Sequence, residues 1–158
     1  MASEICCPDL DTSLWDHTEH YWEDKSFFSV PTFVISHMPL RVGMDIERCR
    51  KAARARGYEL AKEPLILAQD GFLRGRVLYE LADYPKGDTS VRHFHRTRFR
   101  SVISTENWNQ IGRAMQRLLQ WLRRDGLKPG GIYMWYTRCP DCVQKKGFLN
   151  VILAEIAG

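Results

Sequence analysis

The hydrophobic positions in the first half of the chain change from strand-like to helix-like spacing and back. Residues 30–40 are rich in β-branched and aromatic side chains and end near a proline, which predicts a strand. Behind Asp45, a typical N-cap residue, apolar positions recur at helical spacing as far as Gly57, which predicts a helix. An apolar run at 64–68 and another at 72–82 follow, separated by a turn signal. The first half therefore predicts strand, helix, strand, strand.

The second half repeats that order. We expect a long strand at 91–103, then a helix capped by Ser104 or Thr105 with an apolar stripe that reaches Leu122. Two further strands are expected at 131–138 and 148–156. Two βαββ halves with one apolar sheet face each will join. We predict an α+β fold in which two βαββ halves form one antiparallel sheet, with two helices on one face and a ligand cleft at the pseudo-two-fold seam.

Residues 1–26 are polar and aromatic without periodicity. Exposed tryptophans are costly, so we expect Trp15 and Trp22 to lie over an apolar surface while the first dozen residues are mobile. The predicted organisation is a partly mobile N-terminal segment, 1–26, followed by a single domain, 27–158.

Length and composition fit one ordinary domain. With 158 residues, 44% of them hydrophobic, the chain is long enough to bury a core. No apolar run reaches the roughly 18–20 residues of a membrane helix, and the N-terminus lacks the pattern of a secretory signal. The five cysteines are an odd number, which argues against a disulfide framework. We therefore expect a cytoplasmic protein without a membrane partner.

The net charge of +4 favours anionic partners only weakly. Arginines occupy four of the five even positions of the strand residues 92–100, which predicts one wet strand face and one covered face. This strand, with the basic residues of 48–56, is the basis of an alternative function, a nucleic-acid or protein-interaction module. Acids interleave elsewhere and no nucleic-acid motif accompanies the arginines, so we do not expect a nucleic-acid partner.

Three stretches resemble a known family. These are residues 20–28 (HYWEDKSFF), residues 31–40, and the sequence Trp135-Tyr136-Thr137-Arg138-Cys139-Pro140-Asp141-Cys142. They resemble small bacterial proteins that are called hydrolases and look like the GyrI-like small-molecule-binding domain. The resemblance covers roughly residues 20–156 and implies the two-fold βαββ fold with a cleft for aromatic or cationic small molecules. Some relatives hydrolyse reactive, DNA-alkylating natural products with an aromatic cage, and others only bind.

The chain departs from that family at its cleft. GyrI-like domains tend to carry two cleft carboxylates, and alignment places Arg76 and Asn150 at those positions. Trp108 replaces the tyrosine of a turn before the second helix. These three residues are predicted ligand contacts, and the lost carboxylates favour a neutral or anionic ligand.

Aromatic residues are the other predicted ligand contacts. Tyr133 and Trp135 alternate onto one face of their strand, and with Trp22 they are expected to line the cleft. The alternative is that these rings belong to the core, above all Trp108 on the helix stripe.

Glu80 and Glu155 each stand inside an otherwise apolar strand. The commoner place for such a carboxylate is the solvent face, and the alternative is a pocket suited to acid–base work. Glu80 or His37 is the catalytic base if its side chain points into the cleft. The sequence thus predicts binding of a small, largely apolar or aromatic molecule in the cleft, with hydrolysis for xenobiotic or natural-product protection left open.

Cys139 and Cys142 fit a turn, a redox pair or half of a metal site. His93 and His95 point the same way on their strand and would complete a Cys₂His₂ zinc set with them. We expect a structural turn that carries two thiols, with no metal and no cofactor.

Overall fold

A single seven-stranded antiparallel sheet and the helices that flank it make up the computed structural model, which describes residue 7 and residues 9–35, 38–39, 42–69, 74–106, 111–138 and 140–157. The elements, in chain order, are η1 (Thr12–Leu14), β1 (Thr18–Ile35), β2 (Met38–Pro39), α1 (Val42–Ala55), β3 (Ile66–Gln69), β4 (Arg74–Leu81), β5 (Val91–Ser104), α2 (Gly112–Arg124), β6 (Lys128–Tyr136), α3 (Pro140–Lys146) and β7 (Asn150–Ala157).

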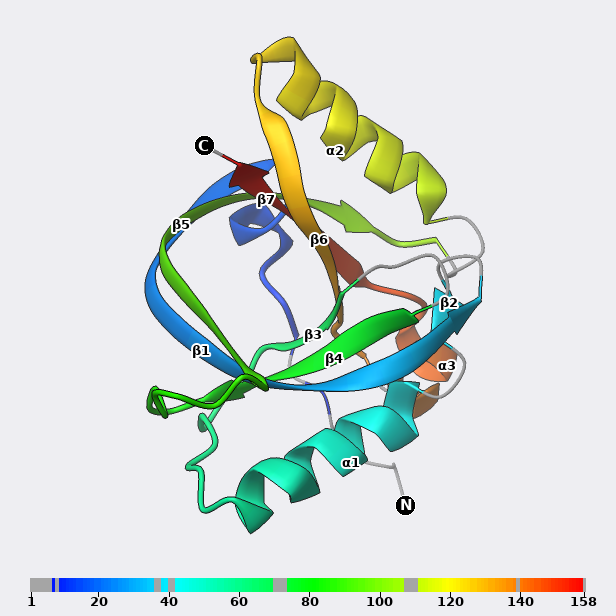
Figure 1. The fold of residues 1–158 in the computed structure, drawn as a ribbon. Helices are drawn as coiled ribbons and strands as arrows, with labels where there is room; N and C mark the ends of the chain where they lie inside the picture. The colour runs from blue at the N-terminus through cyan, green and yellow to red at the C-terminus, as the bar shows by residue number, and fades with distance from the viewer. Residues whose placement is uncertain are drawn as a thin grey trace.

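The sheet is closed rather than open. The strand order is β2-β1-β4-β3-β6-β7-β5, and an additional pairing between β1 and β5 closes the six strands from β1 to β5 into a barrel, with β2 attached to β1 outside the ring (Figure 1). The closure depends on the length of β1, whose 18 residues pair with β5 from Thr18 to Phe28 and with β4 from Ser26 to Phe33. The α+β class and the antiparallel sheet are confirmed, and the closure of that sheet into a barrel is a feature that the prediction did not contain.

Large side chains fill the inside of this barrel. Every barrel strand contributes to the inner cluster, which consists of Trp22, Phe27, Leu67, Leu78, Phe94, Phe99, Tyr133, Val151 and Leu153. The Phe94 and Phe99 rings lie 5.3 Å apart in an edge-on arrangement. The centre of the barrel is therefore a packed core.

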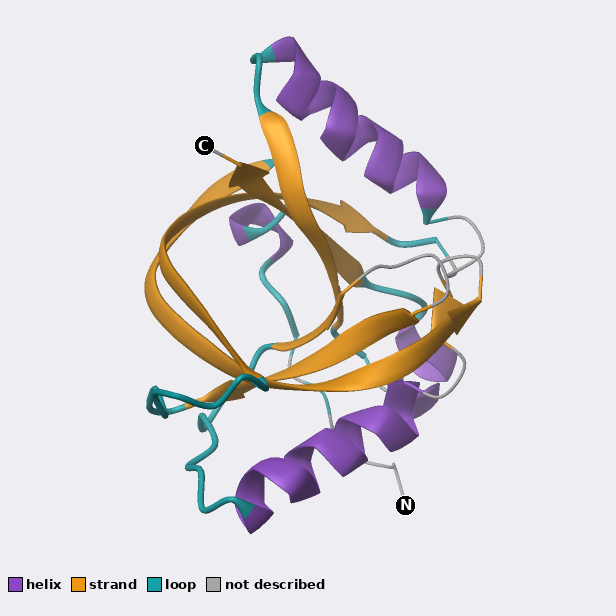
Figure 2. Ribbon diagram, in the orientation of Figure 1, coloured by secondary structure: helices purple, strands orange, loops and turns teal. Residues whose placement is uncertain are grey.

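Both long helices pack on the outside of the barrel (Figure 2). α1 buries Cys49 and Ala53 against Phe28 and Val77, which point away from the inner cluster. α2 buries its apolar stripe against β5, β6 and β7. The glycines predicted to stop these helices lie just beyond them, each with a positive φ that favours glycine.

The predicted helix starts need correction. α1 begins at Val42, so Asp45 lies within its first turn, where its carboxylate accepts a hydrogen bond from the Thr32 hydroxyl. α2 begins at Gly112, and Ser104 instead accepts a hydrogen bond from the backbone N–H of Glu106. A local turn therefore uses the serine expected at the helix cap.

The alternation of β5 breaks in its middle. Phe94 and Phe99 are five residues apart and both belong to the inner cluster, which an unbroken strand does not allow. Arg96, between them, has a φ of 49° in the left-handed region. The predicted wet face is therefore wrong at Phe94 and also at Arg100, which are both buried.

Part of the predicted N-terminal segment lies against the barrel, including one of the dozen residues that were expected to be mobile. Leu10 and Trp15 pack against the inner cluster, and Trp22 is part of it. β1 starts at Thr18, so residues 18–26 of the predicted segment are strand residues of the barrel.

Residues 140–146, which follow β6, form the helix α3 where the sequence predicted a turn. Cys142 lies in α3 and is buried, and Cys139 is outside the described residues. Within the part of the chain that the structure describes, no helix has the length and apolar character needed to cross a membrane.

Candidate functional site

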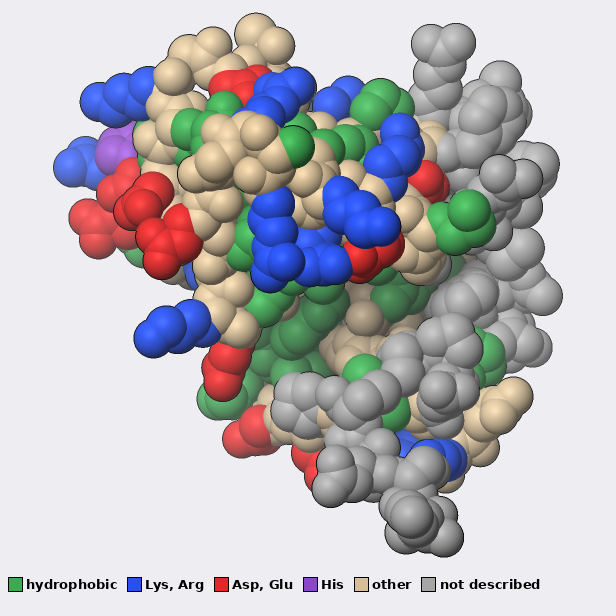
Figure 3. All heavy atoms as spheres, turned by 90° about the horizontal axis from the view of Figure 1, so that it is seen from below, with side chains coloured by type: hydrophobic (Ala, Val, Ile, Leu, Met, Phe, Trp, Pro, Cys, Tyr) green, Lys and Arg blue, Asp and Glu red, His purple; other side chains and the backbone are tan. Residues whose placement is uncertain are grey.

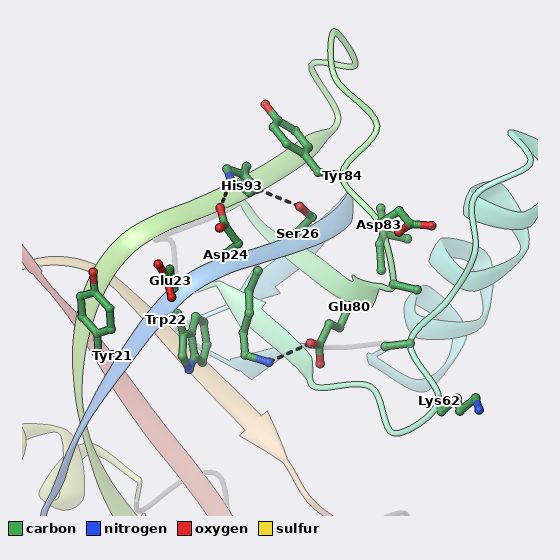
Figure 4. Close-up of a pocket in the computed structure, with 14 residues that line it drawn as sticks. Tyr21, Trp22, Glu23, Asp24, Ser26, Lys62, Glu80, Asp83, Tyr84 and His93 are labelled. Atoms are coloured by element: carbon green, nitrogen blue, oxygen red, sulfur yellow. Dashed lines mark hydrogen bonds and ion pairs between the residues drawn. The ribbon is translucent and has the colours of Figure 1, made fainter.

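A pocket of about 680 Å³ opens where β1 separates from β4. β4 pairs with β1 only from Ser26 onward, and residues 59–65 pair with the end of β4 instead, for example through the Ala61 N–H and the Glu80 carbonyl. The backbone edge of residues 21–25 thus borders an open space (Figure 4). Residues 21–26, 61–62, 80–84 and His93 line it. The volume lies in the range of small-molecule sites.

Glu80 lies at the floor of this pocket. Glu80 is two residues from Leu78 on β4, so its side chain lies on the same face of the strand as that member of the inner cluster. One carboxylate oxygen lies 2.8 Å from the Lys25 ammonium, and the other accepts the Leu65 backbone N–H at 3.0 Å. The side chain is only 13% exposed, so the solvent-face placement expected for this carboxylate is corrected.

Aromatic side chains form part of the wall. Trp22 is 6% exposed, belongs to the inner cluster and also lines the pocket. The Lys25 ammonium lies 5.7 Å from the centre of its ring. Tyr21, largely exposed, and Tyr84 stand at the entrance. The pocket thus offers an aromatic surface next to a paired carboxylate.

The charges around the pocket are mainly negative. Glu23, Asp24, Glu80 and Asp83 line it, against the lysines 25 and 62. Such a surface favours cations. The sequence expectation of a neutral or anionic ligand rested on Arg76 and Asn150, and neither residue lines this pocket.

A chain of hydrogen bonds crosses from β1 to β5 at the rim. The Ser26 hydroxyl lies 2.8 Å from Nδ1 of His93, whose Nε2 lies 3.0 Å from the Asp24 carboxylate. His95 Nδ1 lies 3.0 Å from the same carboxylate oxygen. Hydrogen bonds from His95 and His93 hold the pKa of Asp24 below its usual value. The Tyr84 ring stacks on His93 at 3.9 Å.

The hydrogen-bonded set of Ser26, His93 and Asp24 contains the three residue types of a serine-hydrolase triad, but the burial of the serine and of the aspartate is reversed. In such triads the serine reaches the substrate and the aspartate is buried. Here Ser26 is 5% exposed and the Asp24 side chain is 62% exposed. The accessible end is therefore the one with the Asp24 carboxylate and the His95 imidazole.

The sequence could not show this cluster. His93 and His95 were noticed as a same-face pair, but their partners depend on the register of β1 and β5, which sets Ser26 beside His93 and Asp24 beside His95. Alternating polar residues on both strands were the only signal.

The other predicted site residues lie elsewhere. Tyr133 is 1% exposed in the inner cluster, where burial raises its pKa. Trp135 packs edge-on against Trp15 at 5.1 Å. Arg76 donates to the Ser29 hydroxyl, and the Asn150 amide lies 3.5 Å from the Glu106 carbonyl. The predicted residues His37 and Trp108 fall outside the described residues.

Acids accompany the arginines proposed for the alternative function. On β5, Arg98 pairs with Glu19, and Arg100 pairs with Asp125. Arg92 lies 3.5 Å from Glu155, which is the other carboxylate considered as a base. On the face seen in Figure 3, basic and acidic side chains lie next to one another. These contacts reduce the positive field that nucleic-acid binding requires.

Together these features define a small α+β protein with a closed antiparallel sheet and a pocket at its edge. The chain belongs to the bacterial hydrolase family, whose sequence model matches residues 1–156. The hydrolase part of the resemblance seen in the sequence is thereby confirmed. A search of curated proteins found no match.

Solved structures share the fold at low sequence identity. The C-terminal domain of EcmrR superposes with a TM-score of 0.65 at 12% identity, covering 91% of this chain and 98% of that one. EcmrR has also been solved in a complex with DNA, where the match covers 58% of its chain. A hydrolase from Listeria innocua gives 0.59 at 9% identity, covering 90% and 93%. SAV2435 bound to tetraphenylphosphonium gives 0.52 at 7% identity, covering 90% and 94%.

Proposed function

We propose that this protein binds a small aromatic molecule with a positive charge in the pocket between β1 and β4, in a cell-protective role against foreign compounds. The observation that carries the proposal is Glu80, a largely buried carboxylate that lines the same acid-rich pocket as the Trp22 ring. An aromatic cation gains from both groups, since the ring face and the carboxylate each attract positive charge.

Lys25 makes the pocket ready for exchange. Its ammonium neutralises Glu80, yet its side chain is 32% exposed and its long stem is flexible. A bound cation replaces the ammonium at the carboxylate, and Lys25 swings into water. The GyrI-like resemblance and the tetraphenylphosphonium complex of SAV2435, a protein of the same fold, support this class of ligand.

Hydrolysis of a bound electrophile is the second candidate function, and membership of the bacterial hydrolase family favours it. Glu80 would act as the general base once Lys25 has moved away: it takes a proton from a water whose oxygen bonds to the electrophilic carbon of the ligand. The carbon–oxygen bond to the leaving group breaks with its electron pair on that oxygen, which takes up a proton from solvent. The position of Glu80 in the pocket lining supports this candidate role.

Two isosteric probes of opposite charge test the binding proposal. Calorimetric titration should show binding of tetraphenylphosphonium and at least tenfold weaker binding of tetraphenylborate. The substitution Glu80→Gln should lower the affinity for tetraphenylphosphonium at least about tenfold, which corresponds to 1.4 kcal/mol of binding free energy. The control is Glu63→Gln, which removes an exposed carboxylate outside the pocket lining. Equal affinity for both probes, or an unchanged affinity in Glu80→Gln, contradicts the proposal.

Hydrolysis is tested separately with a panel of aryl esters and epoxides, and chromatography follows product formation. Turnover by the wild type that Glu80→Gln abolishes supports the base role. Turnover that survives in Glu80→Gln assigns the chemistry to another group.

A further inference from the structure

The rim of the pocket carries three metal-ligand side chains in one cluster. Nε2 of His93, Nδ1 of His95 and a carboxylate oxygen of Asp24 all lie within 4.8 Å of one another. The oxygen is 3.0 Å from each nitrogen. In a tetrahedral zinc site with bonds of about 2.0–2.1 Å, neighbouring ligand atoms stand about 3.3–3.4 Å apart, which is close to the two oxygen–nitrogen distances in this cluster.

We propose that Asp24, His93 and His95 form a binding site for a divalent metal ion of the zinc class. Two imidazoles and one carboxylate are the donor set that borderline metals such as Zn²⁺ prefer over Mg²⁺ or Ca²⁺. The site goes beyond the proposed ligand binding and uses different atoms from Glu80 and Trp22.

The cluster is built by the sheet and does not result from chance contacts between mobile side chains. His93 and His95 are two residues apart on β5 and face the same way, and Asp24 is the direct cross-strand neighbour of His95. Both strands are hydrogen-bonded along this stretch, so the three side chains start from fixed backbone positions.

Ser26 and Tyr84 orient His93. Metal-ligating histidines use their second ring nitrogen for a hydrogen bond that fixes the ring. Ser26 Oγ, which is buried, lies 2.8 Å from Nδ1 of His93 and supplies that partner. When a metal binds Nε2, the ring proton is on Nδ1, and this N–H donates a hydrogen bond to the Ser26 oxygen. Tyr84 stacks on the ring with an interplanar angle of 6°.

The exposure of the donors matches a metal site better than a serine relay. The accessible groups are Asp24 and His95, which a metal ion from solution meets first, and the buried group is the supporting serine. Three protein ligands leave a fourth position of a tetrahedral ion for water, as in catalytic zinc sites. Asp24 and His93 also line the pocket, so that position lies at its rim.

The test is titration of the metal-free full chain with Zn²⁺, followed by calorimetry, and with Co²⁺, followed by visible absorption. We expect one equivalent of each metal to bind, with the absorption of a nitrogen and oxygen site. His95→Asn and Asp24→Asn should each lower the affinity at least 100-fold, and Ser26→Ala should lower it about 10–100-fold through the loss of orientation. His17→Asn, which removes a surface histidine elsewhere and suits its positive φ, should have no effect.

His95 separates the proposal from a serine relay, because the relay would use Ser26, His93 and Asp24 only. Cys139→Ser with Cys142→Ser separates it from the Cys₂His₂ set considered from the sequence. Absence of stoichiometric binding, retention in His95→Asn, or loss in the cysteine variant overturns the site. Binding of tetraphenylphosphonium by metal-free protein is measured in parallel, so failure of the metal site and failure of the ligand pocket are distinguished.

Discussion

Two borders of the inner cluster differ in the residues that lie next to them. At one, Leu10 and Trp15 lie over the cluster, and Trp15 meets Trp135 edge-on, so the border is apolar. At the other, Trp22 borders the pocket beside the ion pair of Lys25 and Glu80. Apolar cover seals a core, whereas charged groups that need water keep a surface open. The proposed ligand pocket therefore lies at the edge of β1, whereas the sealed barrel centre contributes to stability.

Removal of a ring from the barrel centre is expected to have the largest effect. Phe94→Ala should lower the free energy of unfolding by about 3–5 kcal/mol, since it leaves a cavity in a packed core. Urea denaturation followed by circular dichroism measures it. A loss below about 1 kcal/mol would show that the centre of the barrel tolerates empty space and is not a tightly packed core.

Truncation of the apolar cover comes next. Trp15→Ala should lower the free energy of unfolding by about 1–3 kcal/mol, because it removes a half-buried ring and its contact with Trp135. Leu14→Ala, a change at the neighbouring and largely exposed position, should stay within about 0.5 kcal/mol. Equal effects of the two changes would mean that the segment does not seal the core. Tetraphenylphosphonium affinity should be unchanged in both.

On the pocket side, loss of the Lys25 charge should lower the free energy of unfolding by about 1–2 kcal/mol. Lys25→Met leaves Glu80 without its counter-ion, and partial exposure of the pair limits the loss. The same change should raise the affinity for tetraphenylphosphonium several-fold, because no ammonium competes for the carboxylate. Lys62→Met, at the exposed lysine of the same pocket, is the control. Weaker cation binding in Lys25→Met would contradict the exchange of the two cations.

The smallest effect concerns pH at the apolar border. His20 lies 2.7 Å from the Ser101 hydroxyl, which donates to the Trp15 carbonyl. Burial lowers the pKa of His20 below its ordinary 6.5, so the unfolded chain takes up the proton first as the pH falls. Stability should therefore decline below about pH 6.5. His20→Gln should show a smaller decline in melting temperature between pH 7 and pH 5, and an identical decline would exclude His20 as the cause.

Much of the fold could be predicted from local patterns. The period of the apolar residues located α1, α2 and most strands, and Gly57 and Gly126 marked two helix ends. Barrel closure was missed because it depends on residues 18–26, where polar and aromatic side chains alternate without a clear apolar face. The break at Arg96 was missed because a left-handed arginine has no signature in the sequence.

The site was predictable only in part. The sequence singles out Glu80 because a carboxylate in an apolar strand is conspicuous, but it does not show which way the Glu80 side chain points. Asp24 and Ser26 were not found, since only the pairing of β1 with β5 gives them meaning. Tyr133 and Trp135 were expected at a cleft because aromatic rings suit cores and ligand sites equally.

Barrel closure between β1 and β5 also has a consequence for synthesis on the ribosome. The hydrogen bond between the His20 ring and the Ser101 hydroxyl joins residues that are 81 positions apart in the chain. Contacts this distant form slowly, because a long loop must be ordered before any of them is made. The aromatic side chains of β1 leave the ribosome well before β5 exists to pair with that strand. Until then Trp22 and Phe27 have no barrel to enter, and this interval is when the nascent chain is most exposed to aggregation.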